Sequence, residues 1–305
     1  MTKQTIGTLT IVASAAGFAT LAILIKFAYA AGANAITILS ARFLIAALFL
    51  GLLLKKRGIS LYVGKKIGLQ LFLLGALGYG NMALLFASSL NYLPASLTAM
   101  LLYAYPTLVT LMSFVLGNER FSFKKGSALF ISFVGLILVL GVSYNEIHPV
   151  GVFLGLGSAF IYACYIIIGN RLLKDVTPLV TTIYVCASAA IFFILIGLVT
   201  GDLLFNLPLQ GWLAMLAIAV FPTIIGILGF FSGSAHIGAT NASIISTVEP
   251  LITVILAAIL LNESITLAQA LGGVLIITGI VILQVWSKHP ADSSGESKSI
   301  FKKVG

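Results

Sequence analysis

The chain has 305 residues, of which 60% are hydrophobic and 8% are charged, and its mean hydropathy is +1.16. Soluble domains carry roughly 25% charged residues, so this composition excludes a water-covered globular protein and indicates an integral membrane protein. The net charge of +9 does not indicate nucleic-acid binding, because the basic residues stand between apolar runs. The two cysteines, Cys164 and Cys186, lie in separate apolar runs, and we expect neither a disulfide framework nor a metal pair.

Ten apolar runs follow one another along the chain, separated by charged residues, Pro or Asn. Each approaches the ~20 residues that a transmembrane helix needs, and lipid requires the internal backbone pairing of a helix. The first run lacks a signal-peptide cleavage motif and is expected to stay as a span. The predicted spans are residues 6–30, 34–54, 67–90, 94–116, 124–143, 150–172, 177–200, 211–232, 239–261 and 266–286.

The basic residues predict the orientation of these spans. With the N-terminus in the cytoplasm, 15 of the 17 Lys and Arg fall in the cytoplasmic loops and the two ends, and the opposite loops hold none. The positive-inside rule therefore places both termini in the cytoplasm, and we expect the cytoplasmic (inner) membrane. The other two basic residues, Lys26 and Arg42, lie inside spans.

The chain repeats itself at an offset of 144 residues. Gly7 then aligns with Gly151, Pro106 with Pro250, Asn118–Glu119 with Asn262–Glu263, and Gly135 with Gly279. Each half holds five spans, so the second half enters the membrane from the opposite face, as in many secondary transporters. We predict an all-α membrane protein of ten transmembrane helices in a 5+5 inverted-topology repeat. The expected units are residues 1–146, residues 147–286 and a disordered polar cytoplasmic tail, residues 287–305.

Three stretches carry a family resemblance: ARFLIAALFLGLLL in span 2, ASLTAMLLYAYPTLVTLMSFVLGNERFS in span 4 and TNASIISTVEPLITVILAAILLNESIT in span 9. A five-helix unit present twice, each copy with a P-x(12)-E stretch before a Gly-rich last helix, resembles the EamA family of the drug/metabolite transporter superfamily. The stretches run from Pro106 to Glu119 and from Pro250 to Glu263. The resemblance implies export or uptake of small metabolites, typically amino acids and related compounds, through a cavity shared by the halves.

Motifs for catalysis are absent from the sequence. It contains no Walker stretch and no H-E-x-x-H, and its three histidines are scattered. SGSAHIG at 232–238 lacks a nucleophile elbow, and ALGYGNM at 76–82 lacks the context of a potassium filter. We expect no catalytic residues, no metal and no cofactor.

Glu249 is the leading candidate for binding, because an acid near the membrane midplane is costly and usually functional. It shares a helix face with Ser246, and Pro250 leaves an unpaired carbonyl beside it. The repeat places Tyr105 and Pro106 at the equivalent positions. Glu249 could bind a substrate ammonium group, titrate as a coupling proton site, or be a structural acid held by hydrogen bonds.

Aromatic and amide side chains in the spans are candidate cavity lining, and each could instead pack in the core. This set is Phe18, Tyr79, Asn81, Phe86, Tyr103, Tyr162 and Phe230.

The remaining polar residues are expected toward the membrane surfaces. Lys26 either snorkels outward or lines the cavity. Arg42 is expected to be structural and to pair with an outer acid such as Glu263 or Asp202. Glu119 and Glu263 are interpreted as helix caps or gate-closing groups.

Taken together, we predict a secondary transporter for amino acids or related amines and aromatics, acting by alternating access in the export direction. Its expected partners are a small solute, the bilayer and protons as coupling ions, with no nucleic acid, as a monomer or homodimer. The alternatives are a carrier for sugar or phosphate compounds, a channel and an intramembrane enzyme.

Overall fold

The computed structural model describes residues 3–115, 123–141, 148–172, 176–237, 242, 245–246 and 248–286. Every regular element in these ranges is helical, which confirms the all-α prediction for them. Glu119 and the predicted tail, residues 287–305, lie outside the described residues.

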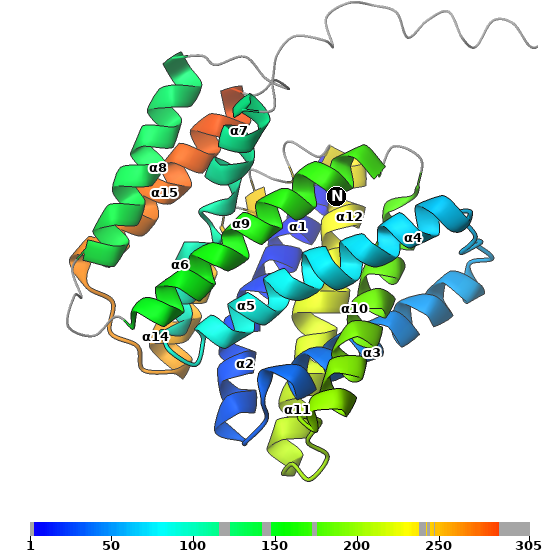
Figure 1. Cartoon of the computed structure of the whole chain (residues 1–305). Helices are drawn as coiled ribbons and strands as arrows, with labels where there is room; N and C mark the ends of the chain where they lie inside the picture. Colours follow the sequence, from blue (N-terminus) through cyan, green and yellow to red (C-terminus); the bar gives the residue numbers. More distant parts are fainter. Residues whose placement is uncertain are drawn as a thin grey trace, which may run out of the picture.

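Helices lie in all ten of the apolar runs (Figure 1). Within the described residues, six helices are long and apolar enough to cross a membrane, and four further apolar helices are shorter. The bounds are α1 Lys3–Ala19, α2 Leu21–Ala30, α3 Ala35–Lys56, α4 Lys65–Leu73, η1 Leu74–Gly80, α5 Asn81–Ser89, α6 Ala95–Leu102, α7 Tyr105–Val115, α8 Phe123–Gly141, α9 Pro149–Leu172, α10 Pro178–Thr200, α11 Leu209–Ile218, η2 Ala219–Ile225, α12 Gly226–Ile237, α14 Glu249–Leu260 and α15 Leu267–Trp286.

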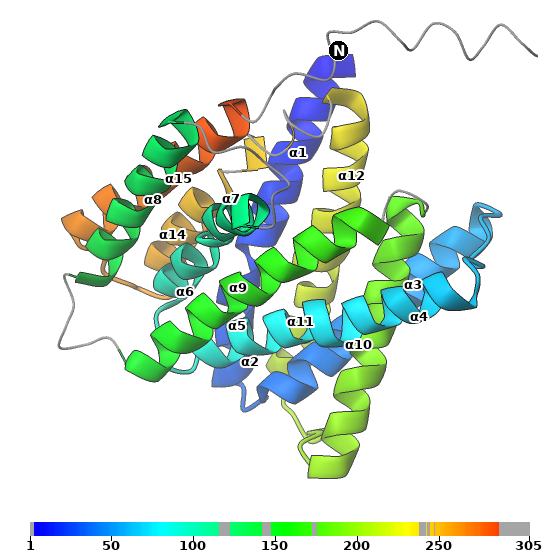
Figure 2. The same ribbon diagram turned by 45° about the horizontal axis from the view of Figure 1, so that its top comes forward.

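The main helix contacts join the two halves of the sequence. α1 lies along α12, α3 along α10, α5 along α9, and α8 along α15 (Figures 1 and 2). Glycines allow the closest approaches: a Cβ atom on Gly135 would lie 2.6 Å from the Gly272 carbonyl oxygen, and one on Gly279 would lie 2.7 Å from that of Ala128. Such small residues let membrane helices pack backbone to backbone.

Hydrogen bonds between helices occur at positions related by the 144-residue offset. Ser14 donates to the Gly226 carbonyl oxygen, and Ser158 donates to that of Met82 at 3.0 Å. Ser14 and Ser158 are 144 residues apart, as are Met82 and Gly226. Each half thus forms the same serine contact with the other half.

Two π-helices interrupt the α-helices of the third and eighth apolar runs. η1 lies between α4 and α5, and η2, which contains Pro222, lies between α11 and α12. A π-turn inserts an extra residue into the helix and often marks a functional region. η1 packs against α10, and η2 packs against α3.

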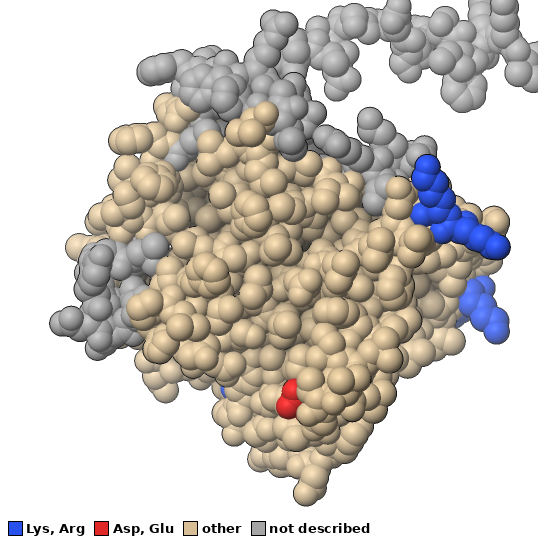
Figure 3. Space-filling view, in the orientation of Figure 1, with Lys and Arg blue, Asp and Glu red and all other residues tan. Residues whose placement is uncertain are grey.

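Many large apolar side chains are exposed on the surface. Large exposed side chains such as Leu48 (60% exposed), Phe153 (76%) and Val199 (87%) are suited to hydrocarbon. Basic side chains gather near the free end of α4, and acidic atoms lie toward the end that holds α2 and α11 (Figure 3). The multi-pass membrane character predicted from composition agrees with this surface.

Candidate solute-binding site

Five tyrosines from three parts of the chain form a cluster, which we call the tyrosine cluster. Tyr79 comes from η1, Tyr103 and Tyr105 from the junction of α6 with α7, and Tyr162 and Tyr165 from α9. The ring centroids of Tyr105 and Tyr162 are 4.7 Å apart, those of Tyr79 and Tyr165 are 5.4 Å apart, and those of Tyr103 and Tyr105 are 6.0 Å apart. Both halves of the chain therefore contribute to one aromatic group.

Glu249 is the first residue of α14 and lies at the edge of the tyrosine cluster. The Tyr103 hydroxyl lies close enough to interact with its carboxyl group. Pro250 fits the first turn of a helix because its missing N–H would have no partner there. The positive end of the helix dipole stabilises an acid at this position, and a helix that begins inside the membrane is a common element of transporter binding sites.

Tyr105 stands at the start of α7 and is followed by Pro106, as Glu249 is followed by Pro250. Both prolines lie in the first turn of a helix, since α7 begins at Tyr105 and α14 begins at Glu249. Ser246 donates to the Ala242 carbonyl oxygen at 2.8 Å.

Arg42 lies at the other end of the tyrosine cluster and is 2% exposed. Its Nε donates to Thr223 Oγ1 at 2.8 Å, and Tyr79 lies close enough to its guanidinium for electrostatic interaction. Its Cζ lies 5.0 Å from the centre of the Phe43 ring. Among the described residues, Arg42 Nη2 has no hydrogen-bond partner, so this atom could bind a solute.

The expected pairing of Arg42 with Glu263 or Asp202 is wrong. The face of α3 that carries Arg42 packs on η2, which brings Thr223 rather than an outer acid to the guanidinium. Glu263 instead caps α6: it accepts from the Ala95 and Ser96 amides at 2.6 and 3.1 Å and from Ser96 Oγ at 2.6 Å. Lys26 lies close enough to Glu263 for electrostatic attraction.

The other candidate lining residues lie in different surroundings. Asn81 donates to the Leu77 carbonyl oxygen of its own helix at 2.7 Å. Phe86 is 5% exposed in the hydrophobic core. Phe18 packs against Gly226, where an added Cβ atom would lie 2.9 Å from the Phe18 ring. Phe230 is a partly buried residue of α12.

Sequence reasoning missed Tyr165 and Thr223 and gave Arg42 a peripheral place. Tyr165 follows Tyr162 by three residues, which is the spacing of neighbours on one helix face. Thr223 is the repeat partner of Tyr79, 144 residues away. The spacing of Tyr165 from Tyr162 was visible in the sequence, whereas the role of Thr223 follows only once the structure places Tyr79 beside Arg42.

The arrangement separates a carboxylate from a guanidinium by a chain of aromatic rings. Successive contacts lead from Arg42 to Tyr79, Tyr162 and Tyr105, and then through Tyr103 to Glu249. An anion can attract an ammonium group, tyrosine faces bind organic cations, and a guanidinium binds carboxylates. The site therefore suits a small organic solute with a positive charge, an aromatic part, or both.

Comparison with known proteins decides the family. The model of the EamA-like transporter family matches the chain twice, over residues 5–141 and 149–285. The chain belongs to the EamA-like transporter family. The resemblance seen in its sequence is thereby confirmed, and the protein is a multi-pass membrane transporter.

Relatives and a solved structure agree with this assignment. Uncharacterized transporter YyaM of Bacillus subtilis is 26% identical over 84% of this chain and 86% of its own length. Uncharacterized transporter YcbK of the same organism is 28% identical over 90% of this chain and 92% of its own length. A crystal structure superposes with a TM-score of 0.67 at 17% identity, covering 93% of this chain and 99% of the other, which supports the fold.

Proposed function

We propose that this EamA-like transporter is a secondary carrier that exports amino acids or related organic amines and aromatics across the cytoplasmic membrane. The observation that carries the proposal is the tyrosine cluster, bounded by Glu249 at one end and Arg42 at the other. An ammonium group would bind Glu249 and the ring faces. A carboxylate on the same solute would bind the Arg42 guanidinium.

The proposed mechanism is alternating access within a 5+5 inverted repeat, residues 1–146 and 147–286. Three observations support the repeat: the double match of the family model, the paired serine contacts, and the glycine contacts. A Cβ atom on Gly7 would lie 2.6 Å from Ile237, and one on Gly151 would lie 2.6 Å from Leu93, its partner under the same offset. Equivalent halves could open in turn toward opposite sides of the membrane.

The proposed orientation has both termini in the cytoplasm and follows the positive-inside rule. Protons are the proposed coupling ion, with Glu249 as their binding group. Glu263 with α6 and Lys26 would then close the outer side.

Counterflow in reconstituted liposomes tests the function. Liposomes preloaded with unlabelled amino acids, amines, sugars or sugar phosphates are diluted into the labelled solute. We expect saturable exchange of amino acids or amines. The exchange rate should fall at least tenfold in Glu249→Gln and stay unchanged in Thr278→Val. This control alters an exposed threonine that is hydrogen-bonded within its own helix. Unchanged exchange and unchanged pH dependence in Glu249→Gln would eliminate the roles proposed for this residue.

A second candidate function is a carrier for anionic compounds such as sugar phosphates. The buried guanidinium, whose Nη2 has no hydrogen-bond partner in the part of the chain that the structure describes, favours it, because arginine binds phosphates as well as carboxylates. Exchange of sugar phosphates, lost in Arg42→Gln and kept in Glu249→Gln, would select this alternative.

A further inference from the structure

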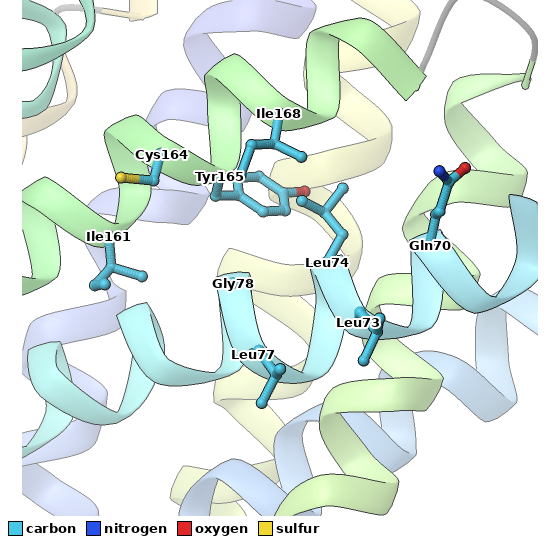
Figure 4. Close-up of a pocket in the computed structure, with 9 residues that line it drawn as sticks. All are labelled: Gln70, Leu73, Leu74, Leu77, Gly78, Ile161, Cys164, Tyr165 and Ile168. Carbon is cyan, nitrogen blue, oxygen red and sulfur yellow. The ribbon is translucent and has the colours of Figure 1, made fainter. Parts of the chain in front are cut away.

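A crevice of about 420 Å³ opens between η1 and α9, beside the tyrosine cluster (Figure 4). At its mouth, Leu73, Leu77 and Ile168 are 46%, 53% and 53% exposed. Ile161 and Cys164 line one side, and the lining contains no charged residue. A mouth rimmed by exposed leucine and isoleucine on membrane-embedded helices faces hydrocarbon rather than water.

The inner wall of this crevice is Tyr165. One side of its ring lines the crevice, while the ring stacks on Tyr162 with centroids 5.9 Å apart and lies 5.4 Å from that of Tyr79. Gly78 makes the room for it, because a Cβ atom there would lie 3.3 Å from Tyr165 Cδ2. The Tyr165 ring is thus the member of the tyrosine cluster that faces the crevice.

The equivalent place in the other half is closed. The offset relates Ile161 to Gly17 and Leu77 to Phe221. A Cβ atom on Gly17 would lie 2.8 Å from the Phe221 carbonyl oxygen, so the backbones of α1 and η2 touch there. The opening at η1 and α9 is therefore not a general result of packing a π-helix against its neighbour.

We propose that this crevice is a lateral port, through which the apolar part of an amphiphilic organic amine lies in, or arrives from, the bilayer while its ammonium group binds Glu249. The inference rests on the proposed function and narrows its substrate class to amines with an alkyl or aromatic group that partitions into lipid. Tyr165 is the group that must rotate to join the port to the tyrosine cluster. Its ring contacts both the crevice and the other rings of the tyrosine cluster.

Alkylation of Cys164 in proteoliposomes tests the port directly. Cys186→Ala leaves Cys164 as the sole thiol, and Cys164→Ala leaves Cys186, which is 1% exposed, as the matched buried control. We expect lipid-soluble N-phenylmaleimide to label Cys164 at least tenfold faster than Cys186, with a membrane-impermeant maleimide labelling neither. Equal labelling of the two thiols, or labelling of Cys164 by the impermeant reagent, would overturn the lateral port.

Protection by amines then tests the occupant. Octylamine should slow the labelling of Cys164 at least fivefold, ethylamine should not, and Glu249→Gln should abolish the protection. Protection that persists in Glu249→Gln would mean that the alkyl chain fills the crevice as a lipid does, and would overturn the proposed class of solute.

A transport comparison separates this inference from the proposed function. In counterflow of phenethylamine, Cys164→Trp should reduce exchange at least fivefold, while Phe160→Trp, at a 49% exposed position of the same helix, should not. If the unmodified protein exchanges phenethylamine but octylamine does not slow the labelling of Cys164, the port is overturned and the carrier stands. Protection without exchange of any amine would overturn the carrier and leave a port that binds amphiphiles.

Discussion

Arg42 shows how the two halves meet at a single side chain. A charged group inside a membrane is costly unless other groups interact with it, and Arg42 interacts with Tyr79 from the first half and Thr223 from the second. These partners are related by the 144-residue offset. The guanidinium therefore occupies a place where equivalent positions of the halves converge, while its own repeat partner, Cys186, carries no charge.

Thr223→Val should lower the stability of the protein. The change removes the acceptor of the Arg42 Nε hydrogen bond, and hydrogen bonds to charged groups contribute about 1.5–3 kcal/mol. Thermal unfolding in detergent should show a lower midpoint than for Thr278→Val, where the lost bond lies on an exposed helix face. Equal midpoints for the two variants would mean that Thr223 does not support the guanidinium.

At the scale of elements, the apolar runs predicted where helices lie but not where they break. Hydropathy reports burial in lipid, and it is insensitive to backbone geometry. At the break after α1, Thr20 Oγ1 donates to the Gly17 carbonyl oxygen at 2.7 Å, and Thr253 from a distant helix donates to the Ala19 carbonyl oxygen at 3.3 Å. The starts of α7 and α14 have local causes in Pro106 and Pro250, so sequence could locate these two breaks.

The candidate site, too, could be predicted from the sequence only in part. Tyr79, Tyr103, Tyr105, Tyr162 and Glu249 are brought together by the structure, and polar groups in apolar runs are easy to notice in a sequence. Phe86 lies in the core, because a phenylalanine in an apolar helix gives no sign of which face it occupies. The place of Arg42 depends on the packing of α3 on η2, which no local pattern encodes.

The pairing of α8 with α15 should be sensitive to one methyl group. In Gly279→Ala the new Cβ would meet the Ala128 carbonyl oxygen at 2.7 Å and the Ser132 amide nitrogen at 3.0 Å, and the helices would have to separate. We expect a lower thermal midpoint, by an effect on the order of 1–3 kcal/mol for overpacking. Gly51→Ala is the control, since no described atom beyond the backbone of its own helix and its chain neighbours lies within 4 Å of the added methyl, and alanine favours a helix. A comparable loss there would contradict the packing explanation.

The cap that Glu263 provides to α6 should depend on its charge. Glu263→Gln keeps one acceptor oxygen and Glu263→Ala keeps none, whereas the native carboxylate accepts from Ala95 and Ser96. Loss of a helix cap costs about 0.5–2 kcal/mol, and hydrogen bonds to a charged acceptor are the stronger ones. Thermal midpoints should fall in the order native, Gln, Ala; a Gln variant as stable as the native protein would show that the charge is unimportant.

At the scale of the whole molecule, the contacts are nearly symmetric and the candidate site is not. The offset relates Glu249 to Tyr105 and Arg42 to Cys186, so each charge of the site has an uncharged partner. A repeated frame can support two equivalent closed ends, whereas binding requires specific groups at one place. Contacts that repeat at the offset and an asymmetric candidate site are thus compatible within one transporter.

The proposed orientation makes a direct prediction about two exposed loop residues, Ser60 and Asn206. In a background without native thiols (Cys164→Ala, Cys186→Ala), Asn206→Cys should react with a membrane-impermeant maleimide added to intact cells. Ser60→Cys, near the basic end of α4, should react only after permeabilisation, because positive loops stay in the cytoplasm. The reverse pattern would invert the topology and the assignment of the Glu263 cap to the outer side. Reaction of both thiols in intact cells would mean that the two loops share one side, which an odd number of crossings between them forbids.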